Sequence, residues 1–108
     1  MSKIYILSDI TRKIGNKNHS WIYELTWIDP DDLTVYSMIV DESYRNYAKW
    51  HDIIQNETLG LYSNLRRRST TDKDNLPVMD ADSSAHLEQQ LTTEDVISYI
   101  EARQDQFS

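Results

Sequence analysis

In residues 21–29, WIYELTWID, large apolar side chains occupy every second position. This pattern limits the possible folds of the chain more than any other feature of the sequence. One face of an extended segment carries four large apolar side chains: Trp21, Tyr23, Leu25 and Trp27. Period two combined with aromatic and β-branched residues indicates a strand. The DPDD that follows is a turn signal, because Pro30 presets the second turn position and Asp29 can cap it.

Residues 33–41, LTVYSMIVD, are expected to return as the antiparallel partner of the first run. Apolar groups fall on both faces, with Val35 and Ile39 on one and Tyr36, Met38 and Val40 on the other. This indicates a strongly curved sheet or an additional interface. Further strands are predicted at 3–14, 60–70 and 76–84, with a hairpin loop at 71–75 and Pro77 at an edge.

Two segments change to helical spacing. Within 41–56, apolar residues follow the i, i+3, i+4, i+7 pattern, which predicts a helix of three turns capped by Ser43 or Asp41. Residues 91–104 predict a C-terminal helix, with Thr92 or Thr93 as its cap and acids in its first turn. The order of elements therefore predicts a mainly β fold: a small, five-stranded, strongly bent antiparallel barrel with a helix between strands 3 and 4.

The length of 108 residues predicts one domain, with the barrel at about 3–86 and an acidic helix and tail at about 91–108. The absence of cysteine excludes disulfides, thiolate catalysis and a cysteine zinc site. The apolar run at the start is too short for a signal sequence, and no stretch is long enough for a membrane helix. We therefore expect a cytoplasmic protein without membrane contact, located in the host cytoplasm if a phage encodes it.

Charge is distributed unevenly along the chain. Residues 80–108 carry seven acids and one base, whereas residues 1–79 carry eleven acids and ten bases. The net charge of −7 argues against a strongly basic DNA-binding domain. This net charge does not exclude a local basic patch on residues 1–79, which are nearly neutral as a whole.

NLRRRSTTDKDN, residues 64–75, contains the three consecutive arginines Arg66, Arg67 and Arg68. Strand alternation predicts that Arg66 and Arg68 share a face with Tyr62, while Arg67 faces the other way. Tyr62 would then stack a base while the arginines bind phosphates. The alternative is an edge strand protected by charge.

Other polar and aromatic groups give weaker signals. Arg45 and Lys49 are expected to extend the same basic surface, whereas Tyr47 and Trp50 are expected in the core. The stripe of aromatic residues from Trp21 to Trp27 is expected in the core or in an oligomer interface, with base stacking as an alternative.

The sequence contains no calcium-loop spacing, no P-loop, no nucleophile elbow and no paired histidines. We therefore predict that the protein is not an enzyme and has no catalytic residues, no metal and no cofactor. An enzyme would need Asp29, Asp80 and Asp82 to converge.

Three segments together resemble a family of small Sm/LSm-like barrel proteins from marine phages of cyanobacteria and from ocean metagenomes: residues 23–54, GLYSNLRR at 60–67 and DADSS at 80–84. The resemblance covers about residues 3–100. It implies a bent Sm-like or SH3-like barrel, assembly into a homo-oligomeric ring through strand edges, and binding of single-stranded RNA. The usual Sm motifs are absent, and no glycine follows the arginines. The helix between strands 3 and 4 is longer than Sm proteins use, which makes an OB-fold the alternative.

Two functions remain open from the sequence. The first is a ring-forming protein that binds single-stranded RNA or DNA through Arg66, Arg67, Arg68, Tyr62, Arg45 and Lys49. The second is a phage protein-interaction module that binds no nucleic acid, which the acidic tail and the apolar outer side chains at 33–41 favour.

Overall fold

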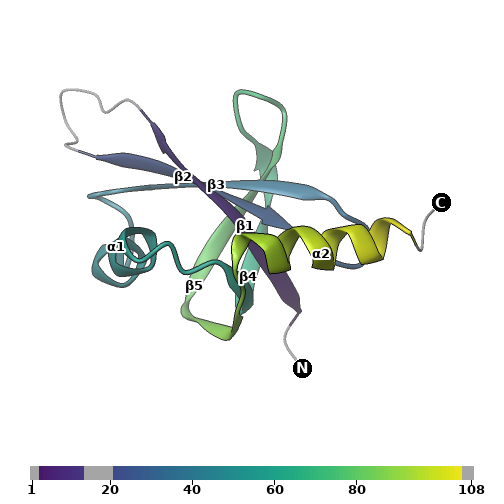
Figure 1. The fold of residues 1–108 in the computed structure, drawn as a ribbon. Helices are drawn as coiled ribbons and strands as arrows, with labels where there is room; N and C mark the ends of the chain where they lie inside the picture. The colour runs from purple at the N-terminus through teal and green to yellow at the C-terminus, as the bar shows by residue number, and fades with distance from the viewer. Residues whose placement is uncertain (1–2, 14–20, 106–108) are drawn as a thin grey trace.

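The computed structural model describes residues 3–13 and 21–105, which form five strands and two helices (Figure 1). The strands are, in chain order, β1 (Ile4–Lys13), β2 (Ile22–Ile28), β3 (Val35–Asp41), β4 (Gly60–Thr71) and β5 (Pro77–Gln90). Helix α1 (Tyr47–Gln55) connects β3 to β4, and α2 (Thr93–Gln104) follows β5. The predicted mainly β fold, with one helix between strands 3 and 4 and one at the C-terminus, is confirmed.

The strands close into a barrel in the order β1–β2–β3–β5–β4, with β4 pairing back onto β1. Four of the neighbouring pairs are antiparallel, whereas β3 and β5 run parallel and pair only at Ser37 and Val78. The expectation of a wholly antiparallel barrel is therefore wrong at this one seam. The strand order and the position of α1 match the five-stranded Greek-key barrel of the OB-fold, the alternative topology.

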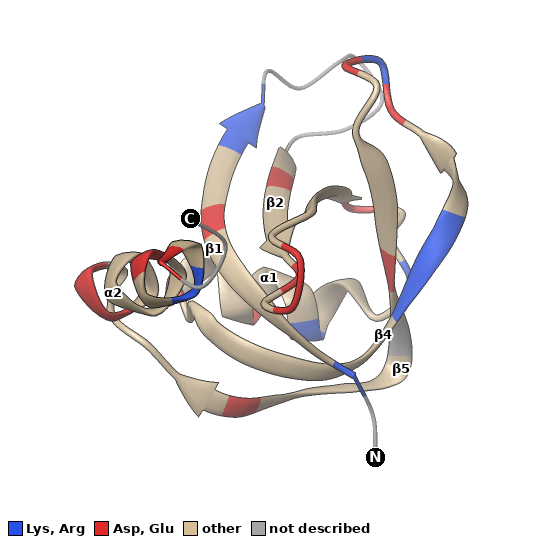
Figure 2. Ribbon diagram, turned by 90° about the vertical axis from the view of Figure 1, so that its right-hand side faces the viewer, with Lys and Arg blue, Asp and Glu red and all other residues tan. Residues whose placement is uncertain are grey.

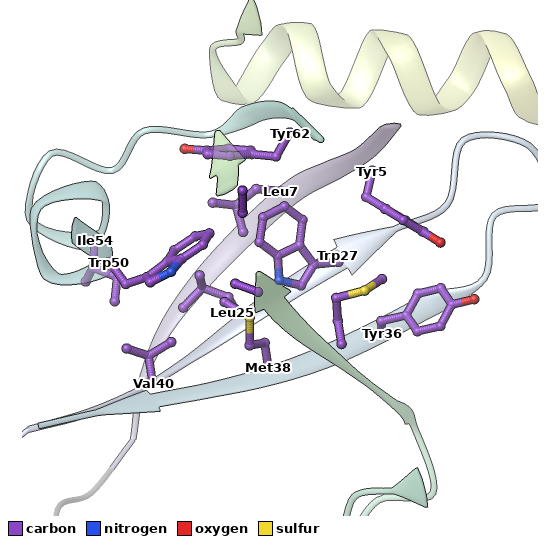
Figure 3. Packing of buried hydrophobic residues seen from close by; sticks show 13 residues of the cluster. Tyr5, Leu7, Leu25, Trp27, Tyr36, Met38, Val40, Trp50, Ile54 and Tyr62 are labelled. Atoms are coloured by element: carbon purple, nitrogen blue, oxygen red, sulfur yellow. The ribbon is translucent and has the colours of Figure 1, made fainter. Parts of the chain in front are cut away.

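The barrel interior is filled by aromatic and aliphatic side chains from every strand and from α1 (Figure 3). Trp27 lies at its centre, with edge-to-face contacts to Tyr62 at 5.3 Å and to Trp50 at 6.1 Å between ring centroids. Such pairs add roughly 0.5–1.5 kcal/mol each beyond the area they bury. Leu25 and Trp27 are fully buried, while Trp21 and Tyr23 pack partly buried at the margin, so the predicted aromatic stripe does face the core.

Pairing between β4 and β5 is interrupted near the middle of both strands. Register passes from Ser63 opposite His86 to Leu65 opposite Ala81, so residue 64 of β4 opposes residues 82–85 of β5. Asn64 adopts a left-handed backbone with φ 63°, which asparagine tolerates better than most residues. The bulge bends the hairpin and reverses the faces of the residues that follow. β5 also continues to Gln90, beyond the predicted end at residue 84.

Helix α1 covers one open end of the barrel with Trp50 and Ile54, as Figure 3 shows. It begins after Asn46, whose backbone is left-handed, and not after Ser43 or Asp41. Those predicted caps are wrong because the Asp41 carboxylate accepts the backbone and hydroxyl hydrogens of Ser43 in a separate turn. Tyr47 was expected in the core but is 54% exposed, because it is the first residue of α1 and the buried residues of the helix are Trp50 and Ile54.

Helix α2 packs on the outside of the barrel against β1. Its buried Val96 meets Ile6 of β1 and Leu91 of the preceding loop in a second apolar cluster. Thr92 is the N-cap, as predicted: its hydroxyl accepts from the Asp95 N–H at 3.0 Å, and the Asp95 carboxylate accepts from the Thr92 N–H. The acidic helix is thus fixed to one side of the molecule.

Gly60 should tolerate no side chain. Its φ is +152°, and a Cβ there would overlap the Gln89 carbonyl oxygen and lie 2.9 Å from Gln90 Cα, so β4 and β5 would have to separate. We expect Gly60→Ala to lower the free energy of unfolding in urea by at least about 2 kcal/mol. Ser69→Ala, an exposed change on the same strand, should cost less than about 0.5 kcal/mol. Equal stabilities for both variants would contradict the close approach.

Candidate nucleic-acid interface

The three arginines follow one another on β4, in its long blue segment in Figure 2, and the bulge at Asn64 divides their side chains between two surfaces. Arg66 lies opposite Asp80 in the ladder, and Arg67 lies opposite the buried Met79. Because cross-strand partners share a face, Arg66 points outward, whereas Arg67 points toward the open end of the barrel. Arg68 follows Arg66 on the outward face and forms an ion pair with the same Asp80 at 3.2 Å.

Asp80 connects the outward arginines to the seam between β3 and β5. Its carboxylate accepts from the Tyr44 hydroxyl at 2.5 Å and from the Ala81 N–H at 2.9 Å. The Tyr44 oxygen in turn accepts from the Ala81 N–H at 3.1 Å. Burial, followed by the Asp80 carboxylate, holds the pKa of Tyr44 well above its usual range, so the phenol keeps its proton. Tyr44 therefore ties the turn after β3 to β5 where the strands barely pair.

A groove of about 300 Å³ lies along this seam. Its lining combines a guanidinium, hydroxyls, two carboxylates and apolar side chains from β3, β4 and β5, among them Ser37, Ile39, Tyr44, Arg68, Thr70 and Asp80. Arg45 is exposed in the turn beside Tyr44, close enough for its charge to act on the Tyr44 phenol. The structure thus brings Arg45, Arg66 and Arg68 to the neighbourhood of one groove.

Arg67 belongs to a different surface at the barrel end. Its guanidinium hydrogen-bonds the Tyr36 hydroxyl, which raises the pKa of Arg67, and it lies near the phenol of Tyr5. Lys3 forms ion pairs with Asp29, at 2.8 Å, and with Asp31 at the same end. Acids therefore balance the cations here, and Arg67 does not join Arg66 and Arg68.

The prediction that Tyr62 stacks a nucleic-acid base is wrong. Its side chain is fully buried against Trp27 and Trp50, and its hydroxyl donates to the Thr58 carbonyl at 2.6 Å. Strict alternation had placed Tyr62 beside Arg66 and Arg68, but the bulge at Asn64 turns the arginines to the opposite face. An asparagine inside a strand pattern was the available signal for that bulge.

Lys49 is also placed differently from the expectation. Its ammonium donates to the Ala85 carbonyl and lies 5.9 Å from the centroid of the Trp50 ring. These contacts attach α1 to the bulged part of β5, so Lys49 has a structural role and does not extend the arginine surface.

The carboxylates at 29–32 serve the turn that the sequence predicted. Asp29 is buried, and its carboxylate accepts from the Asp31 N–H at 2.8 Å. The Asp80 carboxylate is engaged with Tyr44 and Arg68, and nothing is described of the Asp82 side chain. Among the described residues, no group of three or more histidine, aspartate or glutamate side chains converges as a metal site would require. The His51 ring contacts that of Trp21 in a tilted arrangement, at 4.9 Å between centroids, and His19 lies outside the described residues.

Comparison with protein-family models, with curated proteins and with solved structures found no match for this chain. In the part of the chain that the structure describes, neither helix has the length and apolarity needed to cross a membrane. The family resemblance and the function expected from the sequence therefore stay predictions.

Burial of the Tyr62 phenol predicts loss of stability at alkaline pH. Desolvation raises the pKa of Tyr62 well above the usual tyrosine value of about 10, so above pH 10 the unfolded chain binds fewer protons than the folded one. The free energy of unfolding should be steady below pH 9.5 or so and fall as pH rises past about 10. Tyr62→Phe should reduce this slope, while lowering stability near neutral pH by about 1 kcal/mol through the lost hydrogen bond.

The exposed Tyr47 provides the matched control for that measurement. Urea titrations across pH should give the same slope for Tyr47→Phe as for the unmodified chain. An unchanged slope in Tyr62→Phe would mean that its phenol is accessible to solvent.

Proposed function

We propose that this protein is not an enzyme and binds single-stranded RNA or DNA along the groove at the β3–β5 seam. One observation carries the proposal: Arg66 and Arg68 lie on the same outward face of β4, and Arg68 lines the groove. Guanidinium groups suit phosphate because their planar donors form two parallel hydrogen bonds. The OB-type strand order also supports nucleic-acid binding, by analogy of fold alone, because such barrels often bind oligonucleotides.

The Arg68–Asp80 pair does not prevent phosphate binding. The side chains of Arg68 and Asp80 are 53% and 30% exposed, so water screens their attraction. A backbone phosphodiester, whose one negative charge is shared by two non-bridging oxygens, can replace the single carboxylate oxygen that lies 3.2 Å from Arg68. The Asp80 carboxylate therefore competes with phosphate for the arginines, and it weakens the attraction of Arg66 and Arg68 for a nucleic-acid backbone.

Assembly into a homo-oligomeric ring also belongs to this proposal. It is supported by the resemblance of residues 23–54, 60–67 and 80–84 to phage Sm-like barrel proteins. Exposed Ile39, 44% accessible on the outer face of β3, and exposed Leu87, 37% accessible on β5, provide apolar surface for contact between copies.

Removing the outward arginines should weaken binding. Fluorescence anisotropy of labelled single-stranded RNA and DNA should show Arg66→Gln/Arg68→Gln losing at least about tenfold in affinity at low salt. The slope of log affinity against log salt should flatten by about 1.4, because two phosphate contacts are lost. Arg12→Gln/Arg103→Gln, which makes the same change in net charge on β1 and α2, should bind like the unmodified chain. Equal losses in both pairs would show that only net charge matters.

Neutralising Asp80 should have the opposite effect. Asp80→Asn keeps an oxygen to accept from Tyr44 and Ala81 but removes the charge that opposes Arg66 and Arg68. We expect a severalfold gain in affinity for single strands in the same assay. Asp74→Asn, at the exposed hairpin tip, changes the net charge equally and should give a smaller gain. If the two gains are the same, Asp80 does not compete with phosphate.

A protein-interaction module is the second candidate function. The observation that favours it is a hollow of about 410 Å³ over β2 and β3. It is lined by the apolar Ile22 and Ile39 and by the charged Lys13, Glu24, Asp72 and Lys73. Its cations and acids balance, which suits a mixed protein surface better than a polyanion. If the anisotropy of labelled RNA and DNA does not change at low salt, the protein-interaction module becomes the preferred function.

A further inference from the structure

Helix α2 packs against the barrel with only one of its faces. Val96 is buried against Ile6 of β1, and Tyr99 and Ile100 pack against the same cluster. Arg103 lies one turn after Tyr99 and covers its ring, with 3.8 Å between the guanidinium carbon and the ring centroid. The only basic residue of α2 therefore belongs to the side of the helix that faces the barrel.

The face of α2 that points away from the barrel is acidic and partly apolar. Glu94, Ile97 and Glu101 follow the i, i+3, i+7 spacing of one helical face. All three are exposed, and Ile97 keeps 51% of its surface accessible. The two carboxylates are separated by about 10.5 Å along the helix axis, with the isoleucine between them. This outer α2 face thus has an apolar centre with negative charge on both sides.

The groove at the β3–β5 seam has the complementary composition. Arg68 lines it, Arg66 lies on the same face of β4, and Arg45 is exposed in the turn beside it. Ile39 contributes to the apolar part of the lining and is itself 44% exposed. An apolar surface with cations beside it is the counterpart of the outer α2 face, both in charge and in its exposed isoleucine.

Two carboxylates of the groove are already bonded within the chain. Asp80 accepts from the Tyr44 hydroxyl and pairs with Arg68. Asp72 accepts from two backbone N–H groups of the hairpin loop, both at 2.9 Å. The three arginines around the groove therefore outnumber its two carboxylates, although the chain as a whole carries −7. A local positive potential at this seam can attract a negatively charged surface.

The two complementary surfaces cannot meet within one chain. In Figure 2, α2 lies beside β1, across the barrel from the arginine segment of β4. The buried contact of Val96 with Ile6 and Leu91 holds the helix in that place. A second copy of the chain can instead present its α2 to the groove. A contact between two different patches is head-to-tail, and repeated contacts of this kind give a ring or an open chain.

We propose that the outer α2 face of one copy docks on the β3–β5 groove of a second copy, with Ile97 against Ile39 and with Glu94 and Glu101 beside the arginines. The guanidinium groups that bind phosphate then bind carboxylates, so a nucleic-acid strand and α2 exclude each other at any one groove. A ring built on this contact is the nucleic-acid-free form of the protein. The competition rests on the proposed function, whereas the contact between copies does not.

Sedimentation velocity over a concentration series that reaches the millimolar range tests the contact, because a small charged interface is weak. The unmodified chain should self-associate. The groove variant, Arg66→Gln/Arg68→Gln, and the helix variant, Glu94→Gln/Glu101→Gln, should each associate at least about fivefold more weakly. The groove variant keeps an intact α2 and the helix variant keeps an intact groove. An equimolar mixture of the two should therefore form dimers that grow no further.

Two matched controls separate this contact from general effects of charge and apolar surface. Asp52→Asn/Glu57→Gln changes the net charge as the helix variant does, on exposed acids elsewhere, and should associate like the unmodified chain. Ile97→Ser should weaken association, whereas Tyr47→Ser, which removes a similarly exposed side chain from α1, should not. Circular dichroism of each variant checks that the fold is retained.

Unlabelled single-stranded oligonucleotide tests the competition. It should disperse the assemblies of the unmodified chain, and the helix variant should bind labelled oligonucleotide at least as tightly as the unmodified chain does. A mixture of the groove and helix variants that stays monomeric would overturn the contact, even if oligonucleotide binds. Dimers in that mixture without any oligonucleotide binding would support the contact and contradict the proposed function. Oligonucleotide that binds without dispersing the assemblies would overturn the competition.

Discussion

The left-handed backbone at Asn64 determines what the β4–β5 hairpin can present to solvent. Without the bulge, strict alternation would put Arg66 and Arg68 on the same side as Tyr62, inside the barrel. With it, Tyr62 fills the core and the arginines turn outward next to Asp80. A single irregular residue therefore lets one strand provide both a core aromatic and an exposed cationic surface.

The barrel core and the candidate groove are joined by α1 and the turn before it. Trp50 packs at the barrel opening, and Lys49 reaches the Ala85 carbonyl in the bulged segment. Tyr44 then ties the same connection to Asp80 at the seam. Since β3 and β5 share only one paired position, these side chains supply much of the closure that backbone hydrogen bonds provide elsewhere. The groove exists because the strands separate there.

Much of the fold could be predicted from periodicity, but the site could not. Period-two runs located the strands, and the Trp27 and Trp50 patterns identified the centre of the core. Face assignments failed after Asn64, because alternation assumes an unbroken ladder. The link of Asp80 to the arginines depends on register across strands distant in sequence. No local pattern encodes such register.

The acidic helix and the outward arginines lie on different sides of the barrel in Figure 2. Helix α2 holds Glu94, Asp95 and Glu101 against Arg103, and the chain as a whole carries −7. Such a molecule has an electric dipole as well as a net charge. If the protein binds a polyanion as proposed, the net charge would repel that ligand, and the distance between α2 and the arginines would favour approach on the β4 side. Approach would thus be slow but oriented, and added salt, by screening both effects, would accelerate encounter while making it less selective.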